Sequence, residues 1–505
     1  MLGDEVSTLY TVRGNSLGET IRAVSSDAEI SPPLYFVLAW LASKLGSAPE
    51  LIRLPALVAG VAAIPLTYLV GARTVGRTAG MLAATILTLS PFMIFYSTDG
   101  RIYSIAIALL LGSTLAMLAA VESGRRRWWI AYGGLTCLAM YAHYTSAFVL
   151  AGQLLWLFLA HPEARRPAVL ANVGAAILFI PWVPSLVADT QSPTIDILAA
   201  LQGSGFTAKR LAVENWAFGY PYLAPRIFPG VVALLLGALG IAIALGATIW
   251  MRLRNRLVRP SVSSARPTAS GGLALLIVLA VATPVGELLL LLLGGTDLFG
   301  ARNLNTSSAG FTLAVGGLLS SAGPAIGSIC AIAVLSCFTI GATKTLDDDF
   351  RTIGFKDAAQ FVDSNARPAD VVVDRISAAA TPVPLTPLDA YLPPTRKEYR
   401  LYLPTGPPPF LPFRSPVPDP DDLLGDAFAR ARGHRVFLVI PDLSIEHGDR
   451  GEPPAALDLP NGQIGIRLPF GSKIIARRRI TGVRAINVLV VEPAAGRGSG
   501  RSDRR

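Results

Sequence analysis

Carboxylates in or beside long apolar segments are the residues of this chain best suited to chemistry. Asp99 lies in a very short stretch between two apolar segments, and Glu287 lies inside one, three residues after Pro284. A charge beside or within a bilayer is costly unless it is paired or functional. Asp99 has a second interpretation, as the N-cap of a helix that starts near Arg101. Glu287 has one too, as a buried partner of an arginine or of backbone groups freed by the proline.

Histidine and aromatic side chains supply the other candidates. His143 stands where an apolar segment ends, beside Tyr144, and either acts as a ligand or an acid or lies at the lipid interface. Four aromatic residues share one polar stretch: Trp216, Phe218, Tyr220 and Tyr222. For these, stacking on a sugar and placement at the interface are both open. The sequence contains no zinc-site spacing, no P-loop and no dinucleotide-binding glycine motif.

The elements that must position these groups are membrane helices. Of 505 residues, 52% are hydrophobic and 15% are charged, whereas soluble proteins carry about 25% charged residues. The apolar residues form blocks long enough to cross a bilayer, which takes about 20 residues as a helix. Ten candidate spans result: 50–72, 78–98, 101–121, 128–143, 145–160, 167–188, 227–250, 271–294, 305–321 and 323–343. The earlier piece 33–45 is too short and predicts a re-entrant or interfacial helix.

The net charge of +10 comes largely from arginines in short loops between these segments, which indicates membrane topology and not nucleic-acid binding. Because cytoplasmic loops are enriched in basic residues, 73–77, 122–127, 161–166 and 251–268 are predicted to lie inside. Alternation then places these parts outside: 99–100, the His143–Tyr144 corner, 189–226, 295–304 and everything after 343. Residues 1–49 would begin outside with no preceding segment to insert them, which a misplaced start or a truncation would explain.

The sequence predicts four regions. Residues 1–49 form a first outer loop with short interfacial or re-entrant helices, and 50–343 form the transmembrane bundle. Residues 344–493 form an extracytoplasmic α/β domain, with an amphipathic helix over 355–362 and buried strands over 370–374, 435–440 and 486–492. Within it, 381–420 is dense in proline and is predicted to lack regular structure. The basic tail 494–505 is predicted to be disordered.

Several short motifs follow one another in a characteristic order over residues 3–185. They are Gly3-Asp4-Glu5, Ser31-Pro32-Pro33-Leu34-Tyr35, Arg53-Leu54-Pro55-Ala56-Leu57, the basic turn from Gly71 to Gly80, Leu89-Ser90-Pro91, Tyr96-Ser97 followed by Asp99-Gly100-Arg101-Ile102-Tyr103, Tyr141-Ala142-His143-Tyr144 and Pro181-Trp182-Val183-Pro184. Their order and spacing resemble the membrane glycosyltransferases of the GT-C fold, in the family 39-like group of protein O-mannosyltransferases and the lipid A aminoarabinose transferase. A fainter match is Gly300-Ala301-Arg302-Asn303, where relatives often have an Arg-Tyr pair.

The resemblance implies a polyprenyl-phosphate sugar donor and transfer to a glycan, lipid or protein acceptor on the outer face of the cytoplasmic membrane. It implies that Asp4, with Glu5 beside it, is the general base that deprotonates the acceptor hydroxyl. It implies that Asp99 organises the acceptor or, with Asp4, a divalent metal such as Mg or Mn. The leaving phosphate needs a cation to stabilise it, for which Arg101 and Arg302 are the candidates. The remaining cavity residues are expected to be Tyr96, Tyr103, His143 and Glu287.

Two features depart from this group: Ser31 stands where relatives usually have His or Lys before the Pro-Pro pair, and a leading helix is missing. We therefore predict a polytopic α-helical glycosyltransferase of about ten transmembrane helices with a smaller C-terminal α/β domain. Its partners would be the lipid-linked donor, the bilayer and the acceptor, and not nucleic acid. The alternatives are a transporter or lipid flippase, with Glu287 on the substrate path, and a non-catalytic scaffold of envelope assembly.

Overall fold

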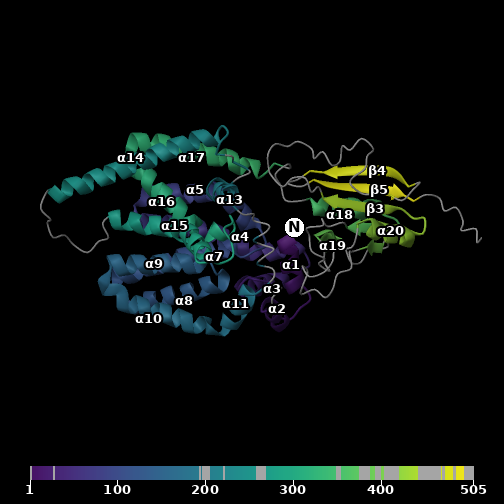
Figure 1. Ribbon diagram of the computed structural model, residues 1–505, viewed down its shortest axis with the longest axis horizontal. Coiled ribbons are helices and arrows are strands. Elements are labelled where there is room, and N and C mark those ends of the chain that lie inside the picture. Colours follow the sequence, from purple (N-terminus) through teal and green to yellow (C-terminus); the bar gives the residue numbers. More distant parts are fainter. Residues whose placement is uncertain are drawn as a thin grey trace, which may run out of the picture. The chain divides into compact units, whose positions relative to one another are not determined.

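The structure is a computed structural model that divides into two compact units. It describes residues 3–26, 29–192, 195, 199, 205–219, 222–223, 225–257, 269–347, 354–374, 387–392, 400–402, 420–441, 468, 472–481 and 485–493. Met1–Arg13 and Leu346–Arg505 form the first unit, and Gly14–Thr345 form the second. Figure 1 gives the element labels used below.

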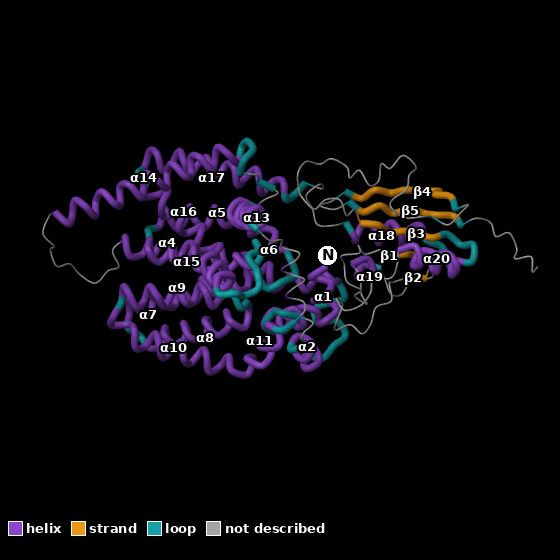
Figure 2. Tube along the Cα trace, in the orientation of Figure 1, coloured by secondary structure: helices purple, strands orange, loops and turns teal. Residues whose placement is uncertain are grey.

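The second unit is entirely helical in its described part, and its helices are joined mostly by short loops (Figure 2). Its first helices are α2 (Leu17–Val24), α3 (Leu34–Ser43), α4 (Leu54–Thr74), α5 (Arg77–Leu89), α6 (Pro91–Thr98), α7 (Tyr103–Ser123), α8 (Arg126–Ala142) and α9 (Ser146–Ala160). The later ones are α10 (Arg165–Phe179), α11 (Val183–Thr190), α13 (Phe206–Phe218), α14 (Gly230–Leu257), α15 (Ala269–Leu292), α16 (Ser308–Ser321) and α17 (Pro324–Lys344). Short 3₁₀ helices are η1 (Pro49–Arg53), η2 (Pro162–Ala164), η3 (Ile180–Trp182) and η4 (Asn303–Ser307).

Every predicted span contains a helix, and the prediction of a helical polytopic membrane protein is confirmed, although the number of spans is not. Among the described residues, five helices are long and apolar enough to cross a membrane, or six if the α5–α6 pair counts as one span. The predicted span 78–98 is not one straight helix, because α5 and α6 are bent by 62° relative to each other. Pro91 lacks the N–H that a continuous helix needs there, and the Ser90 hydroxyl caps α6 by accepting from the Met93 N–H.

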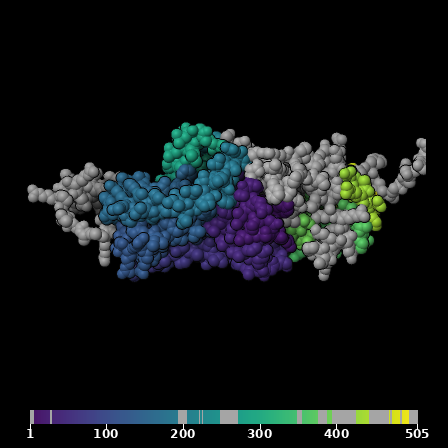
Figure 3. All heavy atoms as spheres, turned by 90° about the horizontal axis from the view of Figure 1, so that it is seen from below, coloured from purple at the N-terminus to yellow at the C-terminus, as the bar shows by residue number. Residues whose placement is uncertain are grey.

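Exposed apolar side chains and close helix contacts both suit this unit to a bilayer. On α10, Leu170, Ile177 and Leu178 are each at least 59% exposed, and α8 to α10 form a continuous surface, coloured blue in Figure 3. Inside the bundle, Gly71 of α4 and Gly80 of α5 approach so closely that a Cβ on Gly71 would lie 2.5 Å from the Gly80 Cα. Small residues at helix contacts are typical of membrane bundles.

The first unit is built on a mixed sheet. Its strands are β1 (Val371–Asp374), β2 (Arg400–Tyr402), β3 (Val436–Pro441), β4 (Lys473–Ile480) and β5 (Ile486–Glu492), in the order β2-β1-β3-β5-β4. β1 runs parallel to β2 and β3, whereas β5 is antiparallel to β3 and β4. Helices α18 (Phe355–Asn365) and α19 (Pro387–Tyr391) pack on one face, and α20 (Pro420–Ala431) packs on the other. Helix α1 (Gly3–Val12) lies against α19.

The predicted helix and the three predicted strands of this domain are present as α18, β1, β3 and β5. The expectation that 381–420 lacks regular structure is wrong in part, because the segment contains α19 and β2. Leu388 of α19 is fully buried in the domain core, and β2 extends the sheet beyond β1. The other residues of 381–419, and the tail 494–505, lie outside the described residues.

Candidate functional site

The turn between α6 and α7 holds two predicted site residues, Asp99 and Arg101. Asp99 follows the last residue of α6 and is 8% exposed. The N-cap of α7 is Ile102, and no side chain caps that helix. The capping interpretation of Asp99 is therefore wrong, because α7 begins beyond the reach of a cap from this carboxylate. Asp99 is instead a buried acid whose backbone oxygen accepts from the Arg101 N–H at 2.7 Å.

Arg101 forms an ion pair with Glu29, which the sequence did not single out. An Nη1 atom of Arg101 lies 3.5 Å from a carboxylate oxygen of Glu29, and the two side chains are 13% and 9% exposed. Glu29 lies ahead of α3, on a stretch remote in sequence from Arg101. Opposite charges brought together by the fold leave no local spacing pattern, so only the structure identifies this partner.

Aromatic contacts join Tyr96, Tyr103 and His143 into one row. The ring centroids of Tyr96 and Tyr103 are 4.6 Å apart, and those of Tyr103 and His143 are 5.7 Å apart. Burial, with the positive charges of Arg302 and Arg101 nearby, lowers the pKa of His143 to about 4. Five residues predicted for the site therefore gather here, and the imidazole among them is neutral at physiological pH.

Hydroxyl groups connect His143 to the interior of the bundle. The Thr145 N–H donates to Nδ1 of His143 at 3.2 Å, so this nitrogen is the acceptor and Nε2 carries the proton. The Thr145 hydroxyl lies 3.2 Å from that of Thr306, which lies 2.8 Å from that of Thr283. The Ser307 hydroxyl donates to that of Thr283 at 2.8 Å. This row of hydrogen-bonded hydroxyl groups holds η4, and with it the neighbouring Arg302, against α9 and α15.

A second buried acid, Asp189 at the end of α11, was also missed. The Tyr144 hydroxyl donates to Oδ2 of Asp189, and Nε1 of Trp182 donates to the Tyr144 oxygen at 2.9 Å. Burial and the Asp189 carboxylate raise the pKa of the Tyr144 phenol well above its usual range, so it remains a donor. Glu29 interacts electrostatically with Asp189. Tyr144 and Trp182 both lie in motifs noted in the sequence, although the hydrogen bonds from Trp182 to Tyr144 and from Tyr144 to Asp189 were not expected.

The remaining predicted residues are not among the contacts described above. Glu287 is buried in α15, one turn beyond Thr283, and the charged group acting on it is Asp297, which forms an ion pair with Lys209. Asp4 and Glu5 belong to the first turn of α1 in the first unit, where Glu5 is fully buried. Trp216 is buried and donates to the Ser308 hydroxyl at 2.9 Å, which is a packing role. Tyr220 lies outside the described residues.

The side chains that could hold a divalent metal at this site are few. Among the described residues, no three His, Cys, Asp or Glu side chains lie close enough to hold one. Protein ligands of Mg²⁺ at phosphate-transfer sites are often one or two carboxylates, with substrate phosphate and water completing the shell. Asp99 therefore fits a metal shared with a substrate phosphate, but not a cage made of protein groups alone.

One family is recognised in the part of the chain that carries this turn. The family described as dolichyl-phosphate-mannose-protein mannosyltransferase matches residues 31–187. The predicted resemblance to family 39-like GT-C glycosyltransferases is thereby confirmed for the segment that contains Asp99, Arg101, His143 and Tyr144. Glu29, Asp189 and Arg302 lie outside it.

Solved structures of other glycosyltransferases are similar to the chain at low identity. ArnT from Cupriavidus metallidurans is 15% identical over 96% of this chain and 92% of its own, with a TM-score of 0.40. The Archaeoglobus fulgidus oligosaccharyltransferase is 12% identical over 83% and 62%, with a TM-score of 0.44. The mycobacterial arabinofuranosyltransferase AftD is 14% identical over 92% and 35%, with a TM-score of 0.40. No curated protein matches the chain.

Proposed function

We propose that the chain transfers a sugar from a polyprenyl-phosphate donor to an acceptor at the outer face of the cytoplasmic membrane. The observation that carries the proposal is the convergence of Arg101 and Arg302 on the neutral His143, beside the buried Asp99. These arginines come from α6–α7 and η4, and one of them lies in the mannosyltransferase-family segment. Two guanidinium groups near one neutral imidazole suit a reaction that releases a phosphate.

The reaction would be a single displacement. The oxygen of the acceptor hydroxyl attacks the anomeric carbon, the bond from that carbon to the phosphate oxygen breaks, and the electron pair leaves with the polyprenyl phosphate. Asp4 is the proposed base that accepts the hydroxyl proton, with Glu5 beside it, and Asp99 orients the acceptor. Arg101 and Arg302 stabilise the charge that develops on the leaving phosphate.

The tyrosines and His143 would shape the cavity around the sugar. Because Nδ1 of His143 accepts from the Thr145 backbone, its Nε2–H is oriented as a donor. The imidazole therefore offers a hydrogen bond to a sugar or phosphate oxygen without adding charge. A divalent metal such as Mg or Mn, if held between Asp99 and the donor phosphate, would supply further charge neutralisation. Glu287 remains a proposed cavity residue.

The test is sugar transfer from radiolabelled polyprenyl-phosphate donors in membranes that contain the chain, together with Asp99→Asn and Glu214→Gln. Glu214 is the control, because its carboxylate pairs with the partly exposed Arg210 and Arg226 on α13 and the following loop. We expect Asp99→Asn to reduce transfer by at least about 100-fold and Glu214→Gln to leave it unchanged. Transfer that survives Asp99→Asn would contradict the assignment of this acid.

A further inference from the structure

The first unit contains a polar cavity whose lining residues have been given no role above. It measures about 590 Å³ and lies between α18 and β4. Its lining is Gly354, Asp357, Gln360, Phe361, Ser364, Asn365, Arg478, Arg479, Ile480 and Thr481. The volume is within the range of about 300–1,000 Å³ typical of small-ligand sites.

The cavity exists because α18 covers only part of its sheet face. The buried side of the helix, Phe355, Ala358, Ala359 and Val362, packs on the inner strands. β4 is the last strand of the described sheet and pairs only with β5. Arg478 lies opposite Val488, whose side chain faces α18, so Arg478 is on the helix side of β4. It remains exposed there, beside the polar flank of α18.

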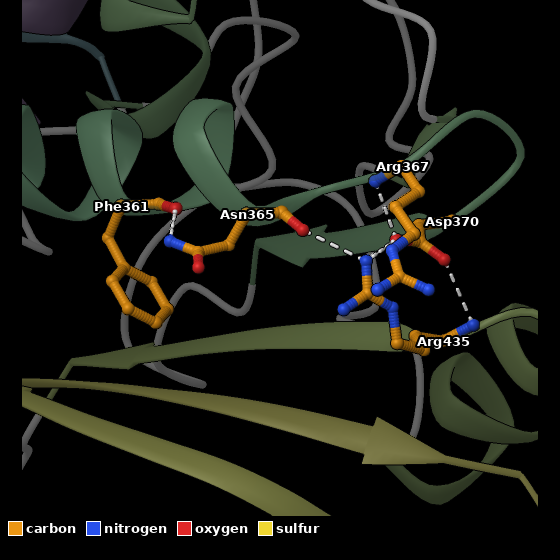
Figure 4. A network of polar contacts seen from close by, with 5 residues as sticks. All are labelled: Phe361, Asn365, Arg367, Asp370 and Arg435. Carbon is orange, nitrogen blue, oxygen red and sulfur yellow. Dashed lines mark hydrogen bonds and ion pairs between the residues drawn. The ribbon is translucent and has the colours of Figure 1, made fainter.

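The helix side of the cavity is held by a partly buried ion pair (Figure 4). Arg435 pairs with Asp370 at 2.6 Å and donates to the backbone oxygen of Asn365, the last residue of α18, at 2.9 Å. The Asn365 side-chain amide donates to the Phe361 backbone oxygen at 2.8 Å, which leaves its own oxygen able to accept a hydrogen bond. The position of this flank therefore does not depend on a ligand.

The chemistry of the lining favours a carbohydrate. Seven of the ten lining residues carry side chains that form hydrogen bonds, and both charge signs are present, negative in Asp357 and positive in Arg478 and Arg479. Sugar hydroxyls donate and accept, so they can use a carboxylate, an amide and a guanidinium together. The half-buried ring of Phe361 offers an aromatic face to the C–H side of a sugar ring.

Other ligand classes fit less well. A polyphosphate or nucleic acid could pair with Arg478 and Arg479 but would also meet the carboxylate of Asp357, and a lipid chain would find only Phe361 and Ile480 as large apolar groups. An extended peptide added to the edge of β4 would use backbone groups and would leave these side chains unused.

We propose that this cavity binds the glycan chain of the acceptor, so that the acceptor class of the proposed transferase is a carbohydrate. That the bound glycan is an acceptor rests on the proposed function, but carbohydrate binding itself can be measured without sugar transfer. The groove would hold internal sugars of the chain, through Arg478 and Gln360 on its two sides and Phe361 beneath.

The experiment uses the full chain in lipid nanodiscs and measures binding of neutral tetrasaccharides of mannose, arabinose and glucose by titration calorimetry and saturation-transfer NMR. We expect at least one to bind and Arg478→Gln to weaken that binding by about tenfold. Arg477→Gln is the matched control, because it removes the same charge from the same strand outside the cavity, and it should leave binding within twofold. Thermal unfolding of each variant verifies the fold, which an exposed arginine should not affect.

The outcomes separate the two proposals. No binding of any tetrasaccharide, equal loss in Arg477→Gln and Arg478→Gln, or binding of a threonine-rich peptide in their place would overturn the carbohydrate site. Tetrasaccharide binding that depends on Arg478, in a chain that transfers sugar from no donor, would support the site and refute the transferase. Transfer to glycans that is insensitive to Arg478→Gln would support the transferase and refute the carbohydrate site.

Discussion

Replacing Arg101 by glutamine leaves Glu29 as a buried acid without its cation, and the cost of that change can be worked from the structure. At 3.5 Å the attraction is about 5 kcal/mol for an effective dielectric constant near 20. Desolvation of both groups offsets most of it, so the pair itself contributes little. Removing one partner alone is different, and we expect Arg101→Gln to lower the free energy of unfolding by about 3 kcal/mol.

A double-mutant cycle isolates this effect. Glu29→Gln combined with Arg101→Gln removes both charges and should recover most of the lost stability, which gives a coupling of about 2 kcal/mol. Thermal unfolding of the purified protein in detergent measures each variant. The control is Arg226→Gln, whose ion pair with Glu214 is at 3.2 Å but whose side chain is 57% exposed, so its loss should be below about 1 kcal/mol.

The same variants separate stability from donor binding. Glu29→Gln leaves the Arg101 guanidinium available for the donor phosphate, so the KM for a polyprenyl-phosphate sugar should stay the same or fall. Arg101→Gln should raise it, because a charge-assisted contact to phosphate is lost. Equal stability losses in Arg101→Gln and Arg226→Gln, or no recovery in the double variant, would refute the buried pair.

Two further changes test the row of residues around His143. Because the pKa of His143 is lowered to about 4 in the folded protein, unfolded chains bind a proton below pH 6.5 while the folded site does not, so stability is complete above pH 6.5 and falls toward pH 4. His143→Asn should abolish about 1–3 kcal/mol of this pH dependence, measured by thermal unfolding. A pH profile of stability that is the same in this variant and the wild type would contradict the assignment. Tyr144→Phe removes the donor to Asp189 and the acceptor of the Trp182 N–H, and should lower the free energy of unfolding by about 1–3 kcal/mol. Its control is Tyr141→Phe, which removes an exposed hydrogen bond to the Leu178 backbone and should lower the free energy of unfolding by less.

Elements with a strong local pattern were predictable from the sequence. Each predicted apolar block contains a helix, and the valine-rich runs predicted β1, β3 and β5, because inner strands are buried on both faces. β4 was missed because an edge strand need not be apolar, and its three consecutive arginines, Arg477 to Arg479, resemble a surface loop. The 62° break between α5 and α6 was missed because Leu89-Ser90-Pro91 interrupts a block whose composition stays apolar.

The site was predictable only where its residues share a motif. Tyr96, Asp99, Arg101 and Tyr103 lie within eight positions, and the structure keeps them at one turn. Arg302 was found through a faint motif, and its approach to His143 depends on the hydroxyl chain that anchors η4. Glu29 and Asp189 have no motif, because their partners are set by tertiary packing and not by spacing along the chain.

The charges gathered at this site imply a condition on donor binding. Asp99, Glu29 and Asp189 bring up to three negative charges to a region where Arg101 and Arg302 are the predicted cations among the described residues, so a donor phosphate would meet acids as well as cations. An incoming donor must therefore displace Glu29 from Arg101 or bring a cation of its own, since a buried uncompensated charge is costly. If Asp99 shares Mg²⁺ with the donor phosphate, Glu29→Gln should reduce the Mg²⁺ concentration needed for half-maximal transfer, because it removes one competing negative charge. A Mg²⁺ dependence that is identical in wild type and Glu29→Gln would show that Glu29 does not compete with the donor phosphate for Arg101.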